Sequence, residues 1–217
     1  MAPTPCIFVL AGNNGAGKSS LGGATIRARG ADYYNPDEAA LRIRAVNPGM
    51  TAEQANAAAW HEGRRLLERA IAERLSFAFE ATLGGRTMAS LLDDAITAGV
   101  EVRVWYVGVE SPELCIERVR ARVAAGGHAI PEAMIRDRYH KSLLNLLQLM
   151  PRISELRVFD NSTEAAPAAG RRPQPVLVLH MKQGRAVATC ELAHAPAWAK
   201  PILAAAIRMS ETSARRG

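Results

Sequence analysis

GNNGAGKS, at residues 12–19, matches the phosphate-binding loop pattern, in which four arbitrary residues separate a glycine from Gly-Lys-Ser. Gly12, Gly15 and Gly17 can take backbone angles closed to other residues, so that successive N–H groups point at phosphate oxygens. Lys18 adds a charge on the β and γ phosphates, and the Ser19 hydroxyl can bind Mg²⁺. The loop therefore predicts binding of ATP with Mg²⁺. The expected ATP-binding residues here are Gly12, Asn13, Asn14, Gly15, Ala16, Gly17, Lys18, Ser19 and Ser20.

The segments around this loop predict an α/β fold of the P-loop NTPase type. An apolar strand at residues 6–10 precedes the loop, and a helix at 19–29 follows it with its N-terminus towards the anion. Strands and helices then alternate from a short strand at 31–35 to residue 160, with helices expected to start at about residues 36, 51 and 111. This alternation predicts a mostly parallel sheet flanked by helices. A hairpin from residue 175 and a helix at 197–209 end the chain. We expect a single domain over 1–217, with its core at about 5–162 and the C-terminal hairpin and helix at 175–209.

Composition excludes several classes of protein. The chain has 217 residues, of which 48% are hydrophobic, and this suits one compact domain. The sequence contains no apolar run long enough for a membrane span and no signal-peptide pattern at its start, so a cytoplasmic protein without membrane contact is expected. The net charge of +6 would allow nucleic-acid binding, but no basic segment is interleaved with aromatic residues, so nucleic acid is not expected as a partner.

Four residues outside the loop predict phosphoryl transfer to a small molecule. Such a kinase needs a carboxylate near the acceptor hydroxyl, cations on the transferred group, and a segment that closes over both. Asp37 and Glu80 lie at the ends of predicted strands, so a hydroxyl could sit between them and the γ-phosphate, and Glu80 could also help to hold Mg²⁺. Arg118 and Arg122 share one helix face ahead of a Gly-Gly hinge, which is the layout of an arginine-bearing lid.

Other classes of triphosphate protein fit less well. The chain lacks the Asn-Lys-x-Asp and Asp-x-x-Gly elements of a GTPase. It also lacks a strand that ends in Asp-Glu and a convincing signature loop, both of which a transport ATPase needs. A non-kinase P-loop ATPase, coupled to a protein or nucleic-acid partner, stays open as the alternative to a kinase.

Several segments together resemble the zeta-toxin-like P-loop kinases. The resemblance spans roughly residues 7–162, and its segments are NPDE at 35–38, FEATL at 79–83 with Arg86, ERV at 117–119, GGHAIPE at 126–132, RY at 138–139 with SL at 142–143, NL at 145–146, and DNS at 160–162. Zeta toxins phosphorylate the 3′-hydroxyl of the amino sugar in UDP-N-acetylglucosamine and are neutralised by a small antitoxin. The resemblance implies that Asp37 is the general base, that Lys18 and its loop hold ATP, and that Glu80, Thr82 and Arg86 bind the nucleotide sugar.

Two positions keep alternative interpretations at this point. Zeta toxins carry a second lid arginine where this chain has His128, and Arg122, Arg136 or Arg138 could supply that charge. Asn161 follows the last parallel strand, where it could border the adenine of ATP, although an asparagine between Asp and Ser is equally typical of a turn.

Overall fold

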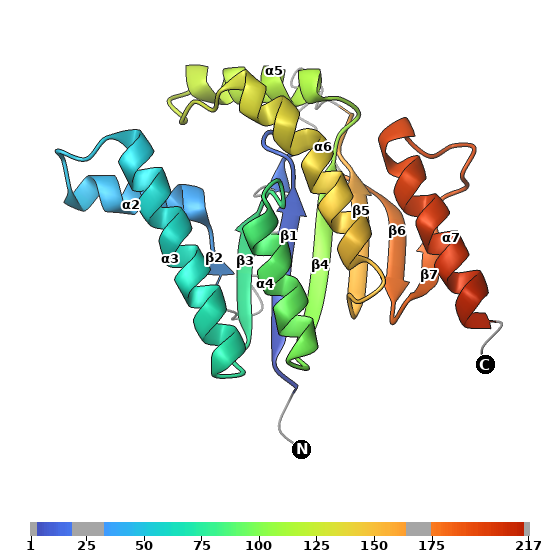
Figure 1. Ribbon diagram of the computed structural model, residues 1–217. Helices are drawn as coiled ribbons and strands as arrows, with labels where there is room; N and C mark the ends of the chain where they lie inside the picture. Colours follow the sequence, from blue (N-terminus) through green and yellow to red (C-terminus); the bar gives the residue numbers. More distant parts are fainter. Residues whose placement is uncertain (1–3, 19–32, 164–174, 215–217) are drawn as a thin grey trace.

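The computed structural model describes residues 4–18, 33–163 and 175–214. These residues form a seven-stranded sheet in the order β2-β3-β1-β4-β5-β6-β7 (Figure 1). The strands are β1 (Cys6–Gly12), β2 (Tyr33–Tyr34), β3 (Phe77–Ala81), β4 (Glu101–Gly108), β5 (Glu155–Asp160), β6 (Val176–Lys182) and β7 (Arg185–Thr189). The helices are α2 (Pro36–Val46), α3 (Ala52–Ala72), α4 (Arg86–Thr97), α5 (Pro112–Ala124), α6 (Glu132–Leu149), η3 (Ala197–Ala199) and α7 (Lys200–Ala214).

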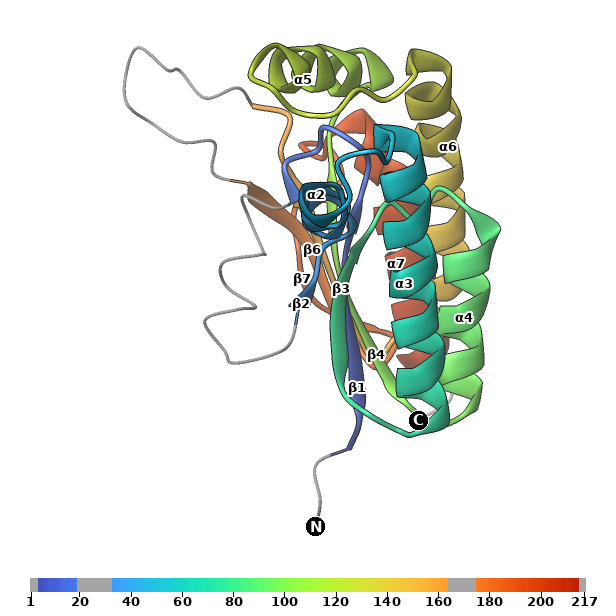
Figure 2. The same cartoon turned by 90° about the vertical axis from the view of Figure 1, so that its left-hand side faces the viewer.

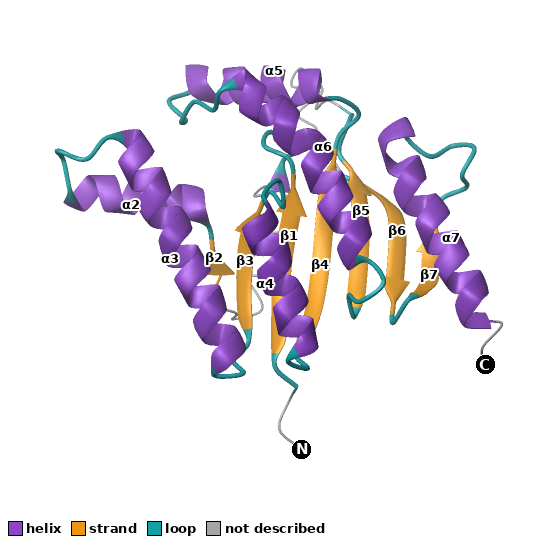
Figure 3. Cartoon of the chain, in the orientation of Figure 1, coloured by secondary structure: helices purple, strands orange, loops and turns teal. Residues whose placement is uncertain are grey.

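The sheet confirms the predicted fold class. β1 pairs in parallel with β3 on one side and β4 on the other, and β2 and β5 extend this parallel part outwards. β6 and β7 add an antiparallel edge, coloured orange in Figure 3 with the other strands. Parallel strands end at the same edge of a sheet, so the residues that follow β1, β2, β3, β4 and β5 gather there.

One face of the sheet carries the main helical layer. Figure 2 shows α3, α4, α6 and α7 on this face, with α5 across the carboxyl ends of the strands. Ile7, Val9, Val104 and Val158 are fully buried beneath this layer. The continuous apolar strands of the sequence therefore build the central part of the core.

Local capping accounts for the starts of three helices. The Asn35 side chain accepts hydrogen bonds from the backbone at the start of α2, and Pro36 stands first in that helix. Thr51 and Gln54 form a reciprocal capping box ahead of α3, and the Ser111 hydroxyl caps α5. These starts agree with the boundaries predicted from the sequence.

Three expected elements differ or fall outside the description. The predicted helix at 19–29 lies outside the described residues. The strand expected at 31–35 is observed as the two residues of β2, and residues 31–32 are not described. The last helix was expected to end at residue 209, but α7 continues to Ala214. Beyond the expected end, the Ser210 hydroxyl accepts a hydrogen bond from the backbone N–H of Ala186 in β7, which links this part of the helix to the sheet. In the part of the chain that the structure describes, no helix is long and apolar enough to cross a membrane.

Candidate functional site

The phosphate-binding loop directly follows the central strand β1. Gly12, Gly15 and Gly17 have φ angles of 139°, 78° and 85°, all in the region that favours glycine. A Cβ at position 12 would lie 2.1 Å from the carbonyl oxygen of Val107, and one at position 15 would lie 2.5 Å from that of Cys115. The loop conformation therefore depends on glycine both for its backbone angles and for its close contact with neighbouring backbone.

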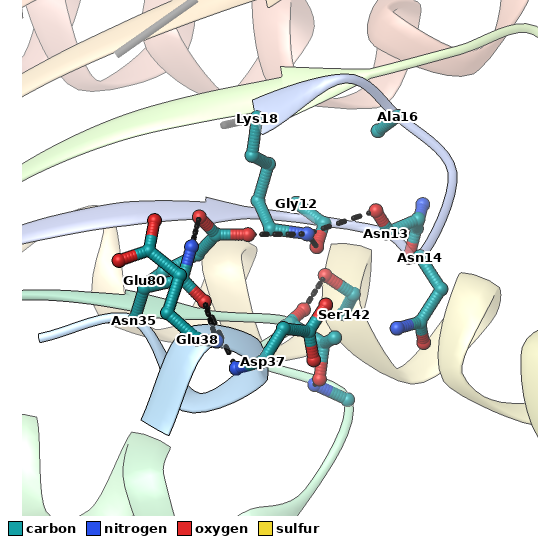
Figure 4. A network of polar contacts seen from close by, with 12 residues as sticks. Gly12, Asn13, Asn14, Ala16, Lys18, Asn35, Asp37, Glu38, Glu80 and Ser142 are labelled. Atoms are coloured by element: carbon teal, nitrogen blue, oxygen red, sulfur yellow. Dashed lines mark hydrogen bonds and ion pairs between the residues drawn. The ribbon is translucent and has the colours of Figure 1, made fainter. Parts of the chain in front are cut away.

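Lys18 folds back over this loop. Its Nζ donates to the carbonyl oxygens of Gly12 and Asn13, each at 3.0 Å, and lies 3.6 Å from Oε1 of Glu80 (Figure 4). The lysine is buried, with 7% of the residue exposed. The cation therefore sits where a phosphate bound in the loop would meet it. Ser19 and Ser20, which were predicted to complete the loop, lie outside the described residues.

Glu80 is a buried carboxylate on β3, the direct neighbour of β1. Besides Lys18, it receives a hydrogen bond from the Tyr33 hydroxyl at 2.8 Å and one from Nδ2 of Asn35 at 3.3 Å. A cation and two donors offset the cost of burying this carboxylate. The predicted juxtaposition of Glu80 with the phosphate-binding loop is therefore present in the structure.

Asn35 connects Glu80 to the start of α2. Its Oδ1 accepts from the backbone N–H groups of Asp37, at 2.9 Å, and Glu38, at 3.4 Å, while its Nδ2 reaches Glu80. This residue was not among the site residues predicted from the sequence. Its position as an asparagine before Pro-Asp at a helix start was the available signal, but that signal indicates a cap and gives no hint of the contact with Glu80.

Asp37 lies one strand further from the loop than Glu80, because β2 pairs with β3 and not with β1. Its Oδ2 lies 3.5 Å from Nη1 of Arg122 in α5, and its side chain is 51% exposed. Figure 4 shows Asp37 in the same region as Lys18, Glu80 and Asn14. The predicted base therefore has an accessible carboxylate at the carboxyl edge of the sheet and a cationic partner from the predicted lid.

Arg122 is also held by the Gly-Gly turn after α5. Its Nη2 donates to the carbonyl oxygen of His128 at 3.2 Å, and a Cβ at position 127 would lie 2.7 Å from its Cγ. The turn thus folds closely over the arginine stem, which places its charged end towards Asp37.

Arg118 lies elsewhere on α5, against the loop that follows β5. Its guanidinium donates to the carbonyl oxygens of Asn161 at 2.9 Å and of Ser162 and Thr163 at 3.5 Å. Asn161 in turn donates from Nδ2 to the carbonyl oxygen of Ala16 at 2.8 Å. The structure therefore joins Arg118 and Asn161 to the phosphate-binding loop from the β5 side, whereas Arg122 meets Asp37.

Thr82 and Arg86 flank a turn directly after β3. The turn contains Leu83 in the left-handed region, at φ 53°, which is strained for a branched side chain. Asn145 of α6 holds this turn by donating to the carbonyl oxygens of Leu83 and Gly85. Arg86 is exposed at the first position of α4, and none of the described residues pairs with its guanidinium.

Arg138 of α6 is the arginine that approaches the phosphate-binding loop. Its Nη1 lies 3.5 Å from Oδ1 of Asn14, and its stem covers Gly84, where a Cβ would meet its Cγ at 2.6 Å. Partial burial lowers the pKa of Arg138, since desolvation disfavours its charged form. Arg136, two residues earlier, instead pairs with Glu113 on the surface.

Three buried polar atoms test whether these residues fit an anionic nucleotide. Among the described residues, Oδ1 of Asn13, Nε of Arg122 and Oδ1 of Asn161 have no hydrogen-bond partner. All three belong to the predicted site, and unpaired buried polar atoms are costly in the absence of a ligand. Phosphate oxygens could accept from Arg122, and a nucleobase amino group could donate to Asn161, so the residues fit ATP.

A magnesium site made by protein side chains alone is not present in the part of the chain that the structure describes, since no group of three or more His, Cys, Asp or Glu residues is placed to hold a metal. Mg²⁺ normally binds through one or two protein oxygens together with substrate phosphates. Glu80 supplies one such oxygen donor beside Lys18. The donor set therefore fits a cation carried by the nucleotide.

Comparisons with known proteins agree with this architecture. A family model described as Zeta toxin matches residues 1–166. An uncharacterized protein of Haemophilus influenzae is 31% identical over 132 residues, which cover 59% of this chain and 88% of that protein. A chain of the AvrRxo1-ORF1:ORF2 complex solved with ATP superposes with a TM-score of 0.66 at 14% identity, over 94% of this chain and 64% of that one. A chain of the PezAT toxin-antitoxin system of Streptococcus pneumoniae gives a TM-score of 0.54 at 15% identity, over 73% of this chain and 68% of that one.

Proposed function

This chain belongs to the zeta toxin family, and we propose that it is an ATP- and Mg²⁺-dependent kinase that phosphorylates a hydroxyl group of a nucleotide sugar similar to UDP-N-acetylglucosamine. The observation that supports this proposal is the exposed carboxylate of Asp37, which follows β2 at the carboxyl edge of the sheet and has Nη1 of Arg122 3.5 Å from its Oδ2. A carboxylate near bound ATP can accept the proton of an acceptor hydroxyl. The fold resemblance to the AvrRxo1-ORF1:ORF2 chain, solved with ATP, supports the nucleotide part of the proposal.

In the proposed reaction, the acceptor oxygen forms a bond to the γ-phosphorus while the bond from that phosphorus to the β–γ bridging oxygen breaks. The hydroxyl proton passes to Asp37, and ADP leaves with the bridging oxygen. Lys18 exchanges its hydrogen bonds to Gly12 and Asn13 for bonds to phosphate oxygens. When bound, Mg²⁺ would supply positive charge that offsets the charge of the phosphates, and Ser19 and Glu80 are its proposed protein ligands.

Two arginines are proposed to neutralise the charge on the transferred group. Arg122 is one, because its Nε is buried without a partner among the described residues and its other nitrogens already reach Asp37 and His128. Arg138 is the other, because it is the partly desolvated cation near Asn14 of the phosphate-binding loop. Arg138 would then supply the second lid charge left open by the sequence. Arg118 is proposed to act from the other side of the loop, through the backbone around Asn161.

The acceptor is proposed to lie between Asp37 and the turn after β3. Glu80, Thr82 and Arg86 surround this region, and Arg86 presents an exposed guanidinium without a described partner, suited to a phosphate of a nucleotide sugar. The strained turn at Leu83 is held by Asn145 of α6, the helix that also carries Arg138.

The test is mass spectrometry of a nucleotide-sugar panel after incubation with protein, ATP and Mg²⁺. We expect one panel member to gain a phosphoryl group with the unmodified chain and not with Asp37→Asn, although Asp37→Asn should still bind ATP. Asp94→Asn, exposed on α4, is the matched control and should behave as the unmodified chain does. Hydrolysis of ATP that requires added DNA, RNA or protein, with no phosphorylated sugar, would instead support a partner-coupled ATPase.

We propose further that the protein acts as the toxin of a toxin–antitoxin pair and binds a small protein antitoxin. The PezAT system, whose chain this one resembles in fold, is described as a toxin-antitoxin system. Induced expression should slow bacterial growth, and Asp37→Asn should remove this effect at equal protein level. Equal growth inhibition by the unmodified chain and by Asp37→Asn would show that toxicity does not depend on phosphoryl transfer.

A further inference from the structure

The C-terminal part of the chain lies outside the family match, which ends at residue 166. Its strands β6 and β7 extend the sheet beyond β5, and η3 and α7 return over the same face as α6 (Figure 2). Trp198, in η3, is buried, with 9% of the residue exposed. This segment therefore brings an aromatic residue to the carboxyl end of β5, next to the predicted nucleotide site.

The Trp198 ring packs directly on the backbone of Gly108, where any side chain would collide with the ring. A Cβ on Gly108, the last residue of β4, would lie 2.2 Å from Cη2 of Trp198. The ring centroid also lies 6.2 Å from that of Tyr106. The indole is thus fixed in place by packing, so the direction of its N–H is fixed as well.

The indole N–H is directed at a carboxylate. Nε1 of Trp198 donates to Oδ1 of Asp160 at 2.9 Å, and the Ser162 hydroxyl donates to the same oxygen. Asp160 is the last residue of β5. Oδ1 of Asp160 therefore receives one hydrogen bond from Ser162 and one from Trp198 in the C-terminal segment. Together, these two bonds fix the direction in which the chain leaves β5.

The next residue, Asn161, makes the connection to the phosphate-binding loop. Its backbone N–H donates to the carbonyl oxygen of Gly108 at 2.9 Å, and its Nδ2 donates to that of Ala16 at 2.8 Å. A Cβ on Gly17 would lie 2.4 Å from this Nδ2, so the amide lies directly on the loop. Oδ1 of Asn161 is buried and has no partner among the described residues.

We propose that Trp198 is a positioning residue for the nucleobase end of the bound nucleotide. Through its hydrogen bond to Asp160, it sets the backbone that presents the unpaired Oδ1 of Asn161 to a donor such as the amino group of adenine. The inference rests on the proposed function only in that ATP binds in the phosphate-binding loop; it does not depend on the acceptor. A phenylalanine at position 198 would keep most of the packing against Gly108 and Tyr106 but would lose the hydrogen bond, which separates the two contributions.

The test compares the affinities of ATP and of inorganic tripolyphosphate, both with Mg²⁺, by titration calorimetry on the full chain. Tripolyphosphate has the phosphates of ATP without its base. We expect Trp198→Phe to weaken ATP binding about tenfold, the value of a lost hydrogen bond to a charged group, and to change tripolyphosphate binding less than about twofold. Trp60→Phe, which makes the same change in α3, is the matched control and should bind both ligands as the unmodified chain does.

Variants at Asp160 test the same contact from its other end. Asp160→Asn keeps an acceptor oxygen and should retain most of the ATP affinity, whereas Asp160→Ala should match Trp198→Phe. The double variant Trp198→Phe/Asp160→Ala should be no weaker than Asp160→Ala alone. Thermal unfolding of each variant shows which forms are folded under the titration conditions, and Asp160→Ala keeps the inference testable if Trp198→Phe does not fold.

Three outcomes would overturn the inference. Unchanged ATP affinity in Trp198→Phe and in Asp160→Ala would show that the contact does not position the nucleotide. An equal loss for ATP and tripolyphosphate would assign Trp198 to general support of the phosphate-binding loop. Failure of the unmodified chain to bind either ligand would overturn the proposed function together with this inference. This outcome is distinguishable from the other two because it is measured on the unmodified chain and requires no variant.

Discussion

Arg122 and Asp37 form an ion pair between α5 and the start of α2, with Nη1 3.5 Å from Oδ2. The two residues come from separate elements on the carboxyl edge of the sheet. Both side chains are partly exposed, at 38% and 51%, so the pair is screened by water and contributes little to stability. We expect this ion pair to orient the carboxylate of Asp37 and to keep a cation near the transferred phosphoryl group.

Arg122→Ala should lower kcat about tenfold or more, because a cation near the developing charge is removed. The free energy of unfolding should change by less than about 1 kcal/mol, as for an exposed ion pair. Steady-state kinetics and urea unfolding measure the two effects. Arg120→Ala, which removes the neighbouring pair with Glu132, is the control. Equal kcat in the two variants would remove Arg122 from the mechanism.

Both the free energy of unfolding and ATP binding should depend on the buried pair of Lys18 and Glu80. Glu80→Ala should destabilise the fold by about 3 kcal/mol, because Lys18 would keep its charge in a buried position without a carboxylate. Lys18→Met should abolish ATP binding. In a double-mutant cycle measured by urea unfolding, the double variant should be more stable than the sum of the single changes predicts. Simple additivity would show that the pair does not interact.

Arg138→Met should lower kcat/KM for ATP about 100-fold and leave the stability unchanged or slightly higher. Methionine keeps a stem over Gly84, and the partly desolvated charge, which lowers the pKa of Arg138, is removed. Arg136→Met is the matched control, since Arg136 pairs with Glu113 on the surface. A larger loss with Arg136→Met than with Arg138→Met would assign the second lid charge to Arg136.

Stability should fall in alkaline solution through Tyr106. Burial raises the pKa of Tyr106 from 10.0 to about 12, and its hydroxyl contacts Ser142 at 3.0 Å. Since the folded pKa lies above the unfolded one, this stabilisation is complete below about pH 10 and is lost as the pH rises towards 12. The loss is at most about 3 kcal/mol. Urea unfolding at about pH 9 and about pH 11 should show a smaller fall for Tyr106→Phe than for the unmodified chain.

The sequence alone predicted the fold class and the main parts of the site. The strand before GNNGAGKS, the alternation of strands and helices, and the caps of α2, α3 and α5 are local patterns, and local patterns determine where elements begin and end. Asp37 and Glu80 were placed near the loop because parallel strands share one carboxyl edge. The roles of these residues in binding and catalysis stay predictions.

Only the tertiary structure decided which arginine meets which partner. Helical spacing put Arg118 and Arg122 on one face, yet one contacts the carbonyls after β5 and the other contacts Asp37. Arg136 and Arg138 are two positions apart, and only Arg138 reaches the phosphate-binding loop. Sequence periodicity determines the face of a helix but not the elements that pack against each end of that face, because packing depends on residues far apart in the chain.

The contact of Trp198 with Asp160 has the same origin. The two residues are 38 positions apart, and neither the hairpin pattern nor the helix pattern indicates that an indole would reach the end of β5. It does so because β6 runs antiparallel to β5 and β7 runs antiparallel to β6, so that β7 ends at the carboxyl edge, where η3 follows. Local sequence patterns determine which residues form strands and loops. Which side chains meet at the edge of the sheet depends on how the layers pack, and this packing involves residues far apart in the chain.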